Sequence, residues 1–248
     1  QKCGSSGQKA SNGIIGSKEC GTTIGYNVRV ATCTEIDESL RDESCKAYPN
    51  HDGDPIYKPT GLLHDFGESD EMFFGLLTGS YQKNISGGTL RRNISSFTEE
   101  VNPQTGIFNK KVDGIVANIN RLKVIDFNNN DSPFYNGKSP YQANSIDYLG
   151  GNSADCAMWG NPVAEIMFET LRYFGGATTA HSVYDYGSGE SKDKTHNLAK
   201  PAWKPPYAKK DNGGGGYPYC ARPVMTVLSD INPSYDYKLP GSRYQSIA

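Results

Sequence analysis

Six cysteines offer the clearest chemistry in this sequence. Their number is even and no two are spaced as C-x-x-C, which argues against zinc ribbons and redox motifs. Scattered cysteines in even number are typical of disulfide bonds formed in an oxidising compartment, and six buried thiols in a reduced protein are the alternative. The six are Cys3, Cys20, Cys33, Cys45, Cys156 and Cys220.

The pairing of these cysteines can be predicted in part. A bridge from Cys33 to Cys45 would close a loop of about a dozen residues and contribute about 3 kcal/mol in the chain-entropy description. This is the pairing that we favour most. A second bridge is predicted between Cys156 and Cys220, which leaves Cys3 for Cys20 by proximity and elimination.

Patterns of catalytic residues are weak. None of the histidines lies three to five residues from another histidine or a cysteine in a metal-ligand pattern. A G-x-S-x-G nucleophile elbow is absent from the sequence. Glu165 and Glu169 are four residues apart on a predicted helix, a spacing that one solvated helix face explains. We therefore predict that the chain is not an enzyme, with glycoside hydrolysis left as a formal alternative.

The composition narrows the class of protein. The 25 Lys and Arg residues nearly balance the 27 Asp and Glu residues, so the net charge of −2 gives no general attraction to nucleic acid or anionic lipid. A hydrophobic fraction of 36% with abundant Gly, Asn, Ser and Tyr suits a loop-rich surface protein. The longest apolar stretch, residues 72–77, is far shorter than the roughly 20 residues that cross a bilayer. Because the chain starts at Gln1 without a signal segment, we treat it as a fragment of something longer.

The first half of the chain predicts short elements. Residues 1–25 are rich in Gly and Ser and have no hydrophobic period, whereas residues 26–32 alternate and place Val28 and Val30 on one face of a strand. Residues 58–66 predict a short helix that stops at Gly67. The apolar run over residues 72–78 predicts a strand covered on both faces.

The middle of the chain predicts a hairpin and a helix. Residues 81–85 and 89–97 flank Ser86-Gly-Gly88, whose glycines suit a hairpin turn that projects from the sheet. Residues 102–106 have the composition of a turn, and Ile115, Ile119 and Leu122 recur at helical spacing. Residues 126–155 predict a long surface loop, for which function and disorder are equal explanations.

The strongest predicted helix begins near Asn161. Asn161 suits the N-cap, Pro162 the first helical position and Gly175 the C-terminal cap. A second long loop follows over residues 177–216, and residues 223–230 predict a buried strand that ends on Asp230. Five apolar residues of the helix form one stripe that we expect to be buried in the core, so that Ala in place of Ile166 or Leu171 should cost about 2 to 5 kcal/mol. They are Val163, Ile166, Met167, Leu171 and Phe174.

These segments would meet in one central sheet covered by the 161–174 helix. The side chains that we expect in the sheet are Val28, Val30, Phe74, Leu76, Met225, Val227 and Leu228.

Eight segments occur in an order that is similar to a known family. They are Tyr26–Val30 followed by Cys33, Glu43–Tyr48, Tyr57–Leu63, Phe74–Tyr81, Gly87–Phe97, Trp159–Glu165, Leu171–Gly175 and Leu228–Ser234. Together they resemble the N-terminal half of the PilY/PilC family of type IV pilus tip-associated adhesins and biogenesis factors. The resemblance runs from about Tyr26 to Gly241, and residues 1–25 lie outside it.

The resemblance implies a fold and a domain organisation. The fold would be a von Willebrand factor A-like (Rossmann-like) α/β domain, a doubly wound sheet that is incomplete at its N-terminus. It would occupy residues 26–241 with loop and hairpin insertions at about 79–155 and 177–219. Residues 1–25 would be a Gly/Ser-rich disulfide loop segment and residues 242–248 a tail.

The resemblance also implies a place for a metal. Domains of this class hold a divalent ion with an Asp-x-Ser-x-Ser strand end, a threonine before a helix and a later aspartate. Asn161 resembles the threonine position and Asp230 the closing aspartate, and their oxygens suit Mg²⁺ or Ca²⁺. A helix cap for Asn161 and a turn for Asp230 are the simpler interpretations. Because Asp-x-Ser-x-Ser is absent from the sequence, we expect the position to stay empty unless upstream residues complete it, and we predict no other cofactor.

The function implied is adhesion and pilus biogenesis at the tip of type IV pili, outside a Gram-negative cell. The partners would be minor pilins, which the segment caps, and a host or abiotic surface, with no nucleic acid. The alternative is a secreted carbohydrate-binding module whose loop tyrosines stack on sugars. Those tyrosines are Tyr135, Tyr141, Tyr148, Tyr184, Tyr186, Tyr217 and Tyr219.

Overall fold

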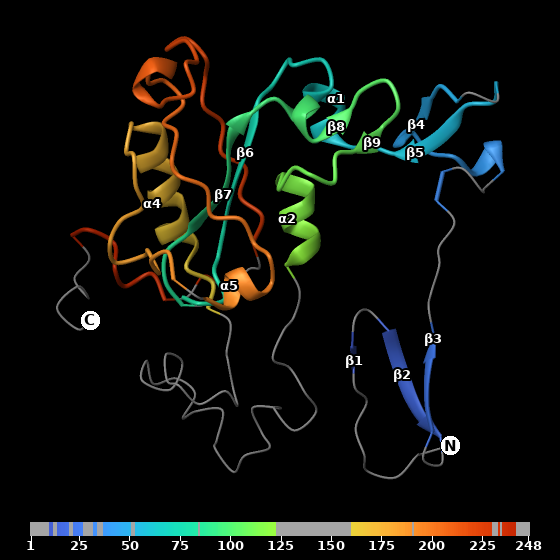
Figure 1. The fold of residues 1–248 in the computed structure, drawn as a ribbon, viewed down its shortest axis with the longest axis horizontal. Helices are drawn as coiled ribbons and strands as arrows, with labels where there is room; N and C mark the ends of the chain where they lie inside the picture. The colour runs from blue at the N-terminus through green and yellow to red at the C-terminus, as the bar shows by residue number, and fades with distance from the viewer. Residues whose placement is uncertain are drawn as a thin grey trace. The chain divides into compact units, whose positions relative to one another are not determined.

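The computed structural model shows a mixed α/β protein with several small sheets, and the chain divides into two compact units (Figure 1). One unit contains residues 1–36 and 124–158, the other residues 37–123 and 159–248. The structure describes residues 10–11, 14–19, 22–26, 32–33, 37–50, 53–83, 85–122, 160–189, 191–229, 233 and 235–241. Within these ranges, no helix has both the length and the apolar character needed to span a membrane.

The first unit contains a three-stranded antiparallel sheet in the order β1-β2-β3. Its strands are β1 (Ala10–Ser11), β2 (Ile14–Glu19) and β3 (Thr22–Tyr26). This part of the chain, for which we predicted only a loop, therefore forms a meander. Val28 and Val30, the predicted strand face, lie outside the described residues.

The second unit opens with a 3-10 turn, η1 (Glu38–Leu40), and a hairpin of β4 (Cys45–Tyr48) with β5 (Ile56–Pro59). Tyr48 ties this hairpin to α1 (Leu62–Gly67), because its buried hydroxyl donates to Glu68 Oε1 over 2.6 Å. The predicted short helix is thus confirmed, with a start four residues later than the pattern indicated.

A second hairpin, β8 (Val101–Asn102) with β9 (Ile107–Phe108), surrounds the predicted turn and follows a short 3-10 turn, η2 (Phe97–Glu99). The buried Glu100 then sets the start of α2 (Ile115–Arg121), since its Oε2 accepts the N–H of Ile115 over 2.7 Å. A side chain at Gly114 would collide with that carboxyl, its Cβ only 2.0 Å from the carboxyl carbon. The periodicity of residues 115–122 therefore predicted this helix correctly.

The central hairpin pairs β6 (Phe74–Thr78) with β7 (Thr89–Ser95) in antiparallel register, Leu77 opposite Leu90. We predicted a hairpin between residues 81–85 and 89–97, and this was wrong, because β7 pairs with β6. Residues 79–88 form the connection, in which Gly87 has a φ of +64°. The glycines do lie in the connection, but the partner strand lies seven residues earlier in the sequence than expected.

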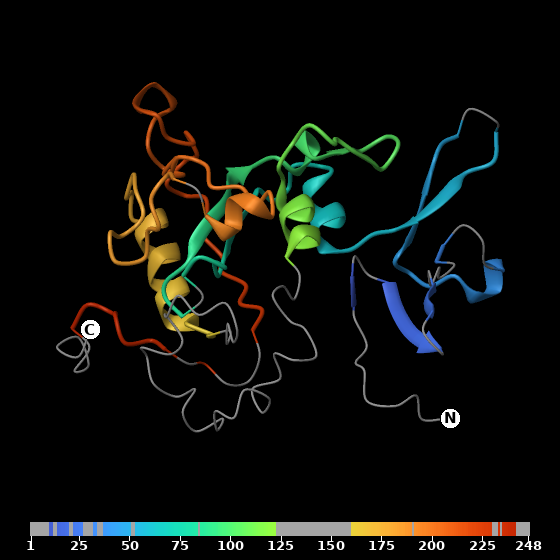
Figure 2. The same cartoon turned by 60° about the horizontal axis from the view of Figure 1, so that its bottom comes forward.

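The helix α4 (Val163–Phe174) lies along the β6–β7 hairpin (Figure 2). Its C-cap is Gly175, as predicted, whereas its N-cap is Pro162 rather than Asn161. The predicted buried stripe is wrong, since Leu171 is 61% and Met167 38% exposed and the other three apolar residues are only half-buried. The buried positions of α4 are instead three residues spaced by four, Glu165, Glu169 and Tyr173.

The long 177–216 loop is held by a buried ion pair. It contains two short helices, α5 (Lys192–Thr195) and η3 (Lys210–Asn212). Arg91 of β7 pairs with Asp193 of α5, and both side chains are 0% exposed. Asp193 Oδ2 also accepts from Ser80 Oγ and from the N–H of Gln82, each over 2.8 Å. The loop is therefore fixed to the central hairpin by a desolvated and fully hydrogen-bonded charge pair.

One central sheet is not present in the described part of the chain. There the strands form separate small antiparallel sheets, and β6 pairs only with β7. The segment 223–229, predicted as a buried strand, is assigned to no strand and is exposed at Val224, Val227 and Leu228. The α/β class is confirmed, but a doubly wound sheet is not formed by the described residues.

Among the cysteines that the structure describes, Cys33 and Cys45 take part in disulfide bonds. Their bonding to each other stays a prediction. Cys220 is a free, exposed cysteine, which does not agree with its predicted pairing with Cys156. Cys3, Cys20 and Cys156 lie outside the described residues.

The Arg91–Asp193 pair leads to a first prediction. Asp193→Asn leaves the Arg91 charge buried without a counter-charge, so we expect a loss of about 3 to 5 kcal/mol in the free energy of unfolding. Asp113→Asn is the matched control, because it breaks a 2.6 Å pair with Arg121 whose side chains are 60% and 31% exposed and should cost at most about 1 kcal/mol. Urea unfolding measures both. Equal losses in the two variants would contradict a structural role for the buried pair.

Candidate functional site: an apolar groove

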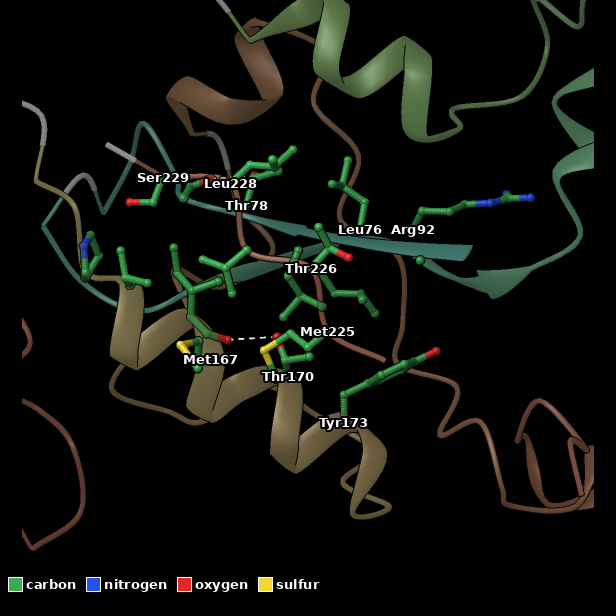
Figure 3. A pocket seen from close by; sticks show the side chains of 18 of the residues that line it. Leu76, Thr78, Arg92, Met167, Thr170, Tyr173, Met225, Thr226, Leu228 and Ser229 are labelled. Atoms are coloured by element: carbon green, nitrogen blue, oxygen red, sulfur yellow. Dashed lines mark hydrogen bonds between the residues drawn. The ribbon is translucent and has the colours of Figure 1, made fainter. Parts of the chain in front are cut away.

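An apolar groove of about 490 Å³ lies in the second unit. Its walls are the β6–β7 hairpin, one face of α4 and the extended segment 224–229, with Ile119 and Leu122 of α2 at its edge. Figure 3 shows Met225 and Thr226 of the extended segment between Leu76 of β6 and Thr170 of α4. The groove is therefore built by parts of the chain that are up to about 150 residues apart. Local sequence patterns do not predict that these parts come together.

Several side chains around the groove are apolar and open to solvent. The exposed fraction is 91% for Leu228, 66% for Val224 and 46% for Val227. Across the groove, Met167 of α4 is 38% exposed and Ile119 of α2 48% exposed. Contiguous exposed apolar surface of this kind marks an interaction site in a stable protein.

Glu165 fixes which face of α4 turns toward the groove. Its carboxylate accepts the N–H of Gly87 over 2.6 Å and that of Lys238 over 2.8 Å, so both oxygens are used. Burial raises the pKa of the Glu165 carboxyl, while the two backbone donors act in the opposite direction. Gly87 has no room for a side chain, because a Cβ would lie 2.3 Å from Tyr184. The connection between β6 and β7 can thus approach the helix closely enough to be held by Glu165.

Glu169 repeats the arrangement one turn later. Its Oε2 accepts the N–H of His181 over 3.0 Å and its Oε1 pairs with Arg172 over 2.5 Å. Asp236 completes the anchorage at the helix start, where its Oδ1 accepts the N–H of Glu165 over 3.0 Å. With these carboxylates directed to the loops, Val163, Ile166 and Met167 of α4 are left on the groove side.

Tyr173 lies at one end of the groove. Its hydroxyl accepts the N–H of Ile94 over 3.0 Å and donates to Asn93 Oδ1 over 3.2 Å. Burial raises the pKa of this hydroxyl to about 12, so it stays neutral in any physiological medium. Tyr173 therefore joins α4 to β7 and offers no acid–base chemistry.

The extended segment has open backbone groups. Within the described ranges, residues 224–228 make no hydrogen bond through the backbone, and the edge of β6 that faces away from β7 has no ladder partner. Strand edges of this kind present a row of N–H and C=O groups that can pair with another strand. The groove thus combines apolar walls with unpaired strand-like backbone.

The predicted metal position lies at one end of the same groove. Asn161 Nδ2 donates to Ser229 Oγ over 2.7 Å, so the start of α4 meets the end of the 224–229 segment. Asp230, the next residue, lies outside the described residues. Among the residues that are described, no group of three or more His, Cys, Asp or Glu could hold an ion. The expectation that the position stays empty without upstream ligands is a prediction that the described residues do not test. The N-cap of α4 is Pro162 and not Asn161.

The loop tyrosines fall into different environments. Tyr184 is 1% exposed and its hydroxyl donates to the Lys238 carbonyl over 2.8 Å, so it is part of the core. Tyr219 is 89% exposed and stacks on Tyr207 with 6.0 Å between the ring centroids. Tyr186 lies under the Lys200 ammonium, 4.1 Å from the ring centroid. Tyr217 lies beside Phe73, with 5.0 Å between the ring centroids. Tyr135, Tyr141 and Tyr148 are outside the described residues.

Residues 74–248 match a family model described as PilY1 homolog, second domain. The chain belongs to the PilY1 homolog family. The matched range contains the strands, helix and extended segment that form the groove, from the first residue of β6 onward. A type IV pilus biogenesis factor, the PilY1 homolog of Xylella fastidiosa (strain Temecula1 / ATCC 700964), is 49% identical over 231 residues. This alignment covers 90% of the chain and 15% of the relative. No solved structure matches the chain.

The buried carboxyl of Glu165 leads to a second prediction. Because its pKa in the folded protein is raised above the ordinary value of 4.5, its contribution to stability is full below that value. The contribution is lost as pH rises through the raised pKa. Glu165→Gln removes this titration. The unfolding free energy of the parent minus that of the variant should therefore decrease as pH rises from 4.5. Urea unfolding at successive pH values measures it.

The matched control is Glu43→Gln, which removes one exposed carboxylate. Its difference from the parent should stay flat over the same pH range. A parent-to-Glu165→Gln difference that grows with pH would show that the carboxylate form is the one the fold prefers.

Proposed function

We propose that this domain works outside the cell, at the tip of type IV pili, as a non-enzymatic component of pilus biogenesis and adhesion. Membership of the PilY1 homolog family supports a role in pilus biogenesis. The observation that carries the proposal furthest is the apolar groove, since open apolar walls beside unpaired strand edges favour contact with polypeptide. Minor pilins are the partners proposed for the domain, with a host or abiotic surface as the target of adhesion.

The fold proposed for the complete region is the von Willebrand factor A-like α/β class. It is supported by the contact of Asn161 with Ser229, which brings the start of α4 to the end of an extended segment. Open α/β sheets bind ligands at such an edge. Under this proposal Mg²⁺ or Ca²⁺ would need ligands from a part of the protein beyond these residues.

The proposal gives a third prediction, made for the full-length protein in its own bacterium. Leu228→Asp and Val224→Asp each put a charge on the groove at positions that are 91% and 66% exposed, where the packing of the second unit itself should be little affected. We expect at least about a tenfold loss of surface pili, counted by electron microscopy, at unchanged protein level. Attachment per piliated cell, measured separately, tells adhesion from assembly.

Leu62→Asp is the matched control for these variants. Leu62 is 72% exposed on α1 and does not line the groove, so piliation and attachment should stay as in the parent. Normal piliation and attachment in both groove variants would remove the groove from the proposed function.

Carbohydrate binding is a second candidate, favoured by the 89% exposed ring of Tyr219 supported from behind by Tyr207. Aromatic faces of this kind stack on sugar rings. The fourth prediction is that, if sugar binding is the function, a glycan array shows saturable binding to a defined sugar that Tyr219→Ala lowers at least about tenfold. Tyr237→Ala, at a tyrosine 37% exposed elsewhere in the chain, is the control. A glycan array without saturable binding would contradict carbohydrate binding as the function.

A further inference from the structure

The extended segment over residues 224–228 is apolar, as in a buried strand, but it is largely exposed to solvent. Val224-Met-Thr-Val-Leu228 is apolar on both faces of an extended chain, a pattern typical of strands covered on both sides. Met225 alone is half-buried in this run, while the residues on either side are exposed. An uncovered apolar strand edge is an aggregation hazard that stable proteins protect. Something must therefore cover this segment in the complete protein.

The shape and chemistry of the groove specify an extended peptide as the cover. β6 and the 224–228 stretch are each five residues long, which is about 17 Å of strand. Both have backbone N–H and C=O groups that no described residue satisfies. A helix satisfies its own backbone and would leave these groups unpaired, whereas an added strand pairs with them. The walls formed by Ile166 and Met225 accept apolar side chains.

We propose that the groove receives one apolar β-strand from a part of the same protein outside these 248 residues. The groove-lining strands and helix lie within the residues that match one domain of the family, described as its second. The chain also spans only 15% of the relative that it matches, so a long stretch of such proteins lies outside these residues. A strand on the same polypeptide is present at high effective concentration and folds onto the groove without a separate binding partner. The inference rests on the family assignment. It gives the groove an occupant from the same polypeptide in place of a pilin, and the cross-links described below distinguish the two.

Photo-crosslinking in the full-length protein tests the source of the strand. Benzoyl-phenylalanine at Val224 or Leu228 should join one segment outside residues 1–248 within the same molecule, in at least about half of the cross-linked peptides identified by mass spectrometry. The same probe at Leu62, 72% exposed and away from the groove, should not reach that segment. Cross-links to a second copy, to a pilin or to residues within 1–248 would each overturn the proposal.

Hydrogen exchange in the full-length protein tests the pairing. Backbone amides of residues 74–78 and 224–228 should be protected at least about 100-fold over an open chain, and more strongly than in the 248-residue chain alone. Equal exchange in the two proteins would overturn strand addition. An intramolecular cross-link and protected amides, together with normal piliation and attachment of Leu228→Asp and Val224→Asp, would leave the inference standing and remove the groove from the proposed function.

Discussion

The orientation of α4 depends on two buried carboxylates, and the rest of the second unit follows from it. Glu165 and Glu169 are both 0% exposed, and they accept backbone N–H groups from three separate stretches of chain, at Gly87, His181 and Lys238. Burying a carboxyl group is costly, and the hydrogen bond that each of these oxygens accepts offsets part of that cost. The polar face of the helix thus becomes the anchored face. The apolar face is left for the groove.

A buried ion pair holds the same end of the central hairpin, at the connection over residues 79–88. Arg91 and Asp193 connect β7 with α5, which is about a hundred residues away in sequence. The two anchoring points hold the long 177–216 loop without a regular sheet beneath it. A loop-rich composition is therefore compatible with a defined structure, because buried polar networks replace part of the apolar core.

Local signals in the sequence predicted local structure well. Gly175 marked the end of α4, and the spacing of Ile115 and Ile119 predicted α2. Long-range partners were not predictable from the same signals. The pairing of β6 with β7 and the burial of Glu165 depend on residues distant in the sequence, such as Lys238. A carboxylate on a helix gives no sign of whether backbone donors will meet it, so Glu165 and Glu169 were assigned to a solvated face. The groove was not predicted for the same reason. Its walls come from elements that are distant in the sequence and are brought together only by the tertiary structure.

At Val224–Leu228 the apolar sequence and the observed exposure differ, and the difference carries information about the complete protein. The sequence predicted a buried strand, and the structure shows an extended segment that is largely exposed. Both statements hold if burial is completed by polypeptide from elsewhere, since a strand pattern encodes coverage but not the identity of the covering chain. An exposed run of this kind inside a family's second domain is then a marker of an interface with the rest of the protein. The contact between Asn161 and Ser229 at the end of this run places the start of α4 at that interface too, so that whatever covers the segment also reaches the position at which Asn161 was expected to serve a metal.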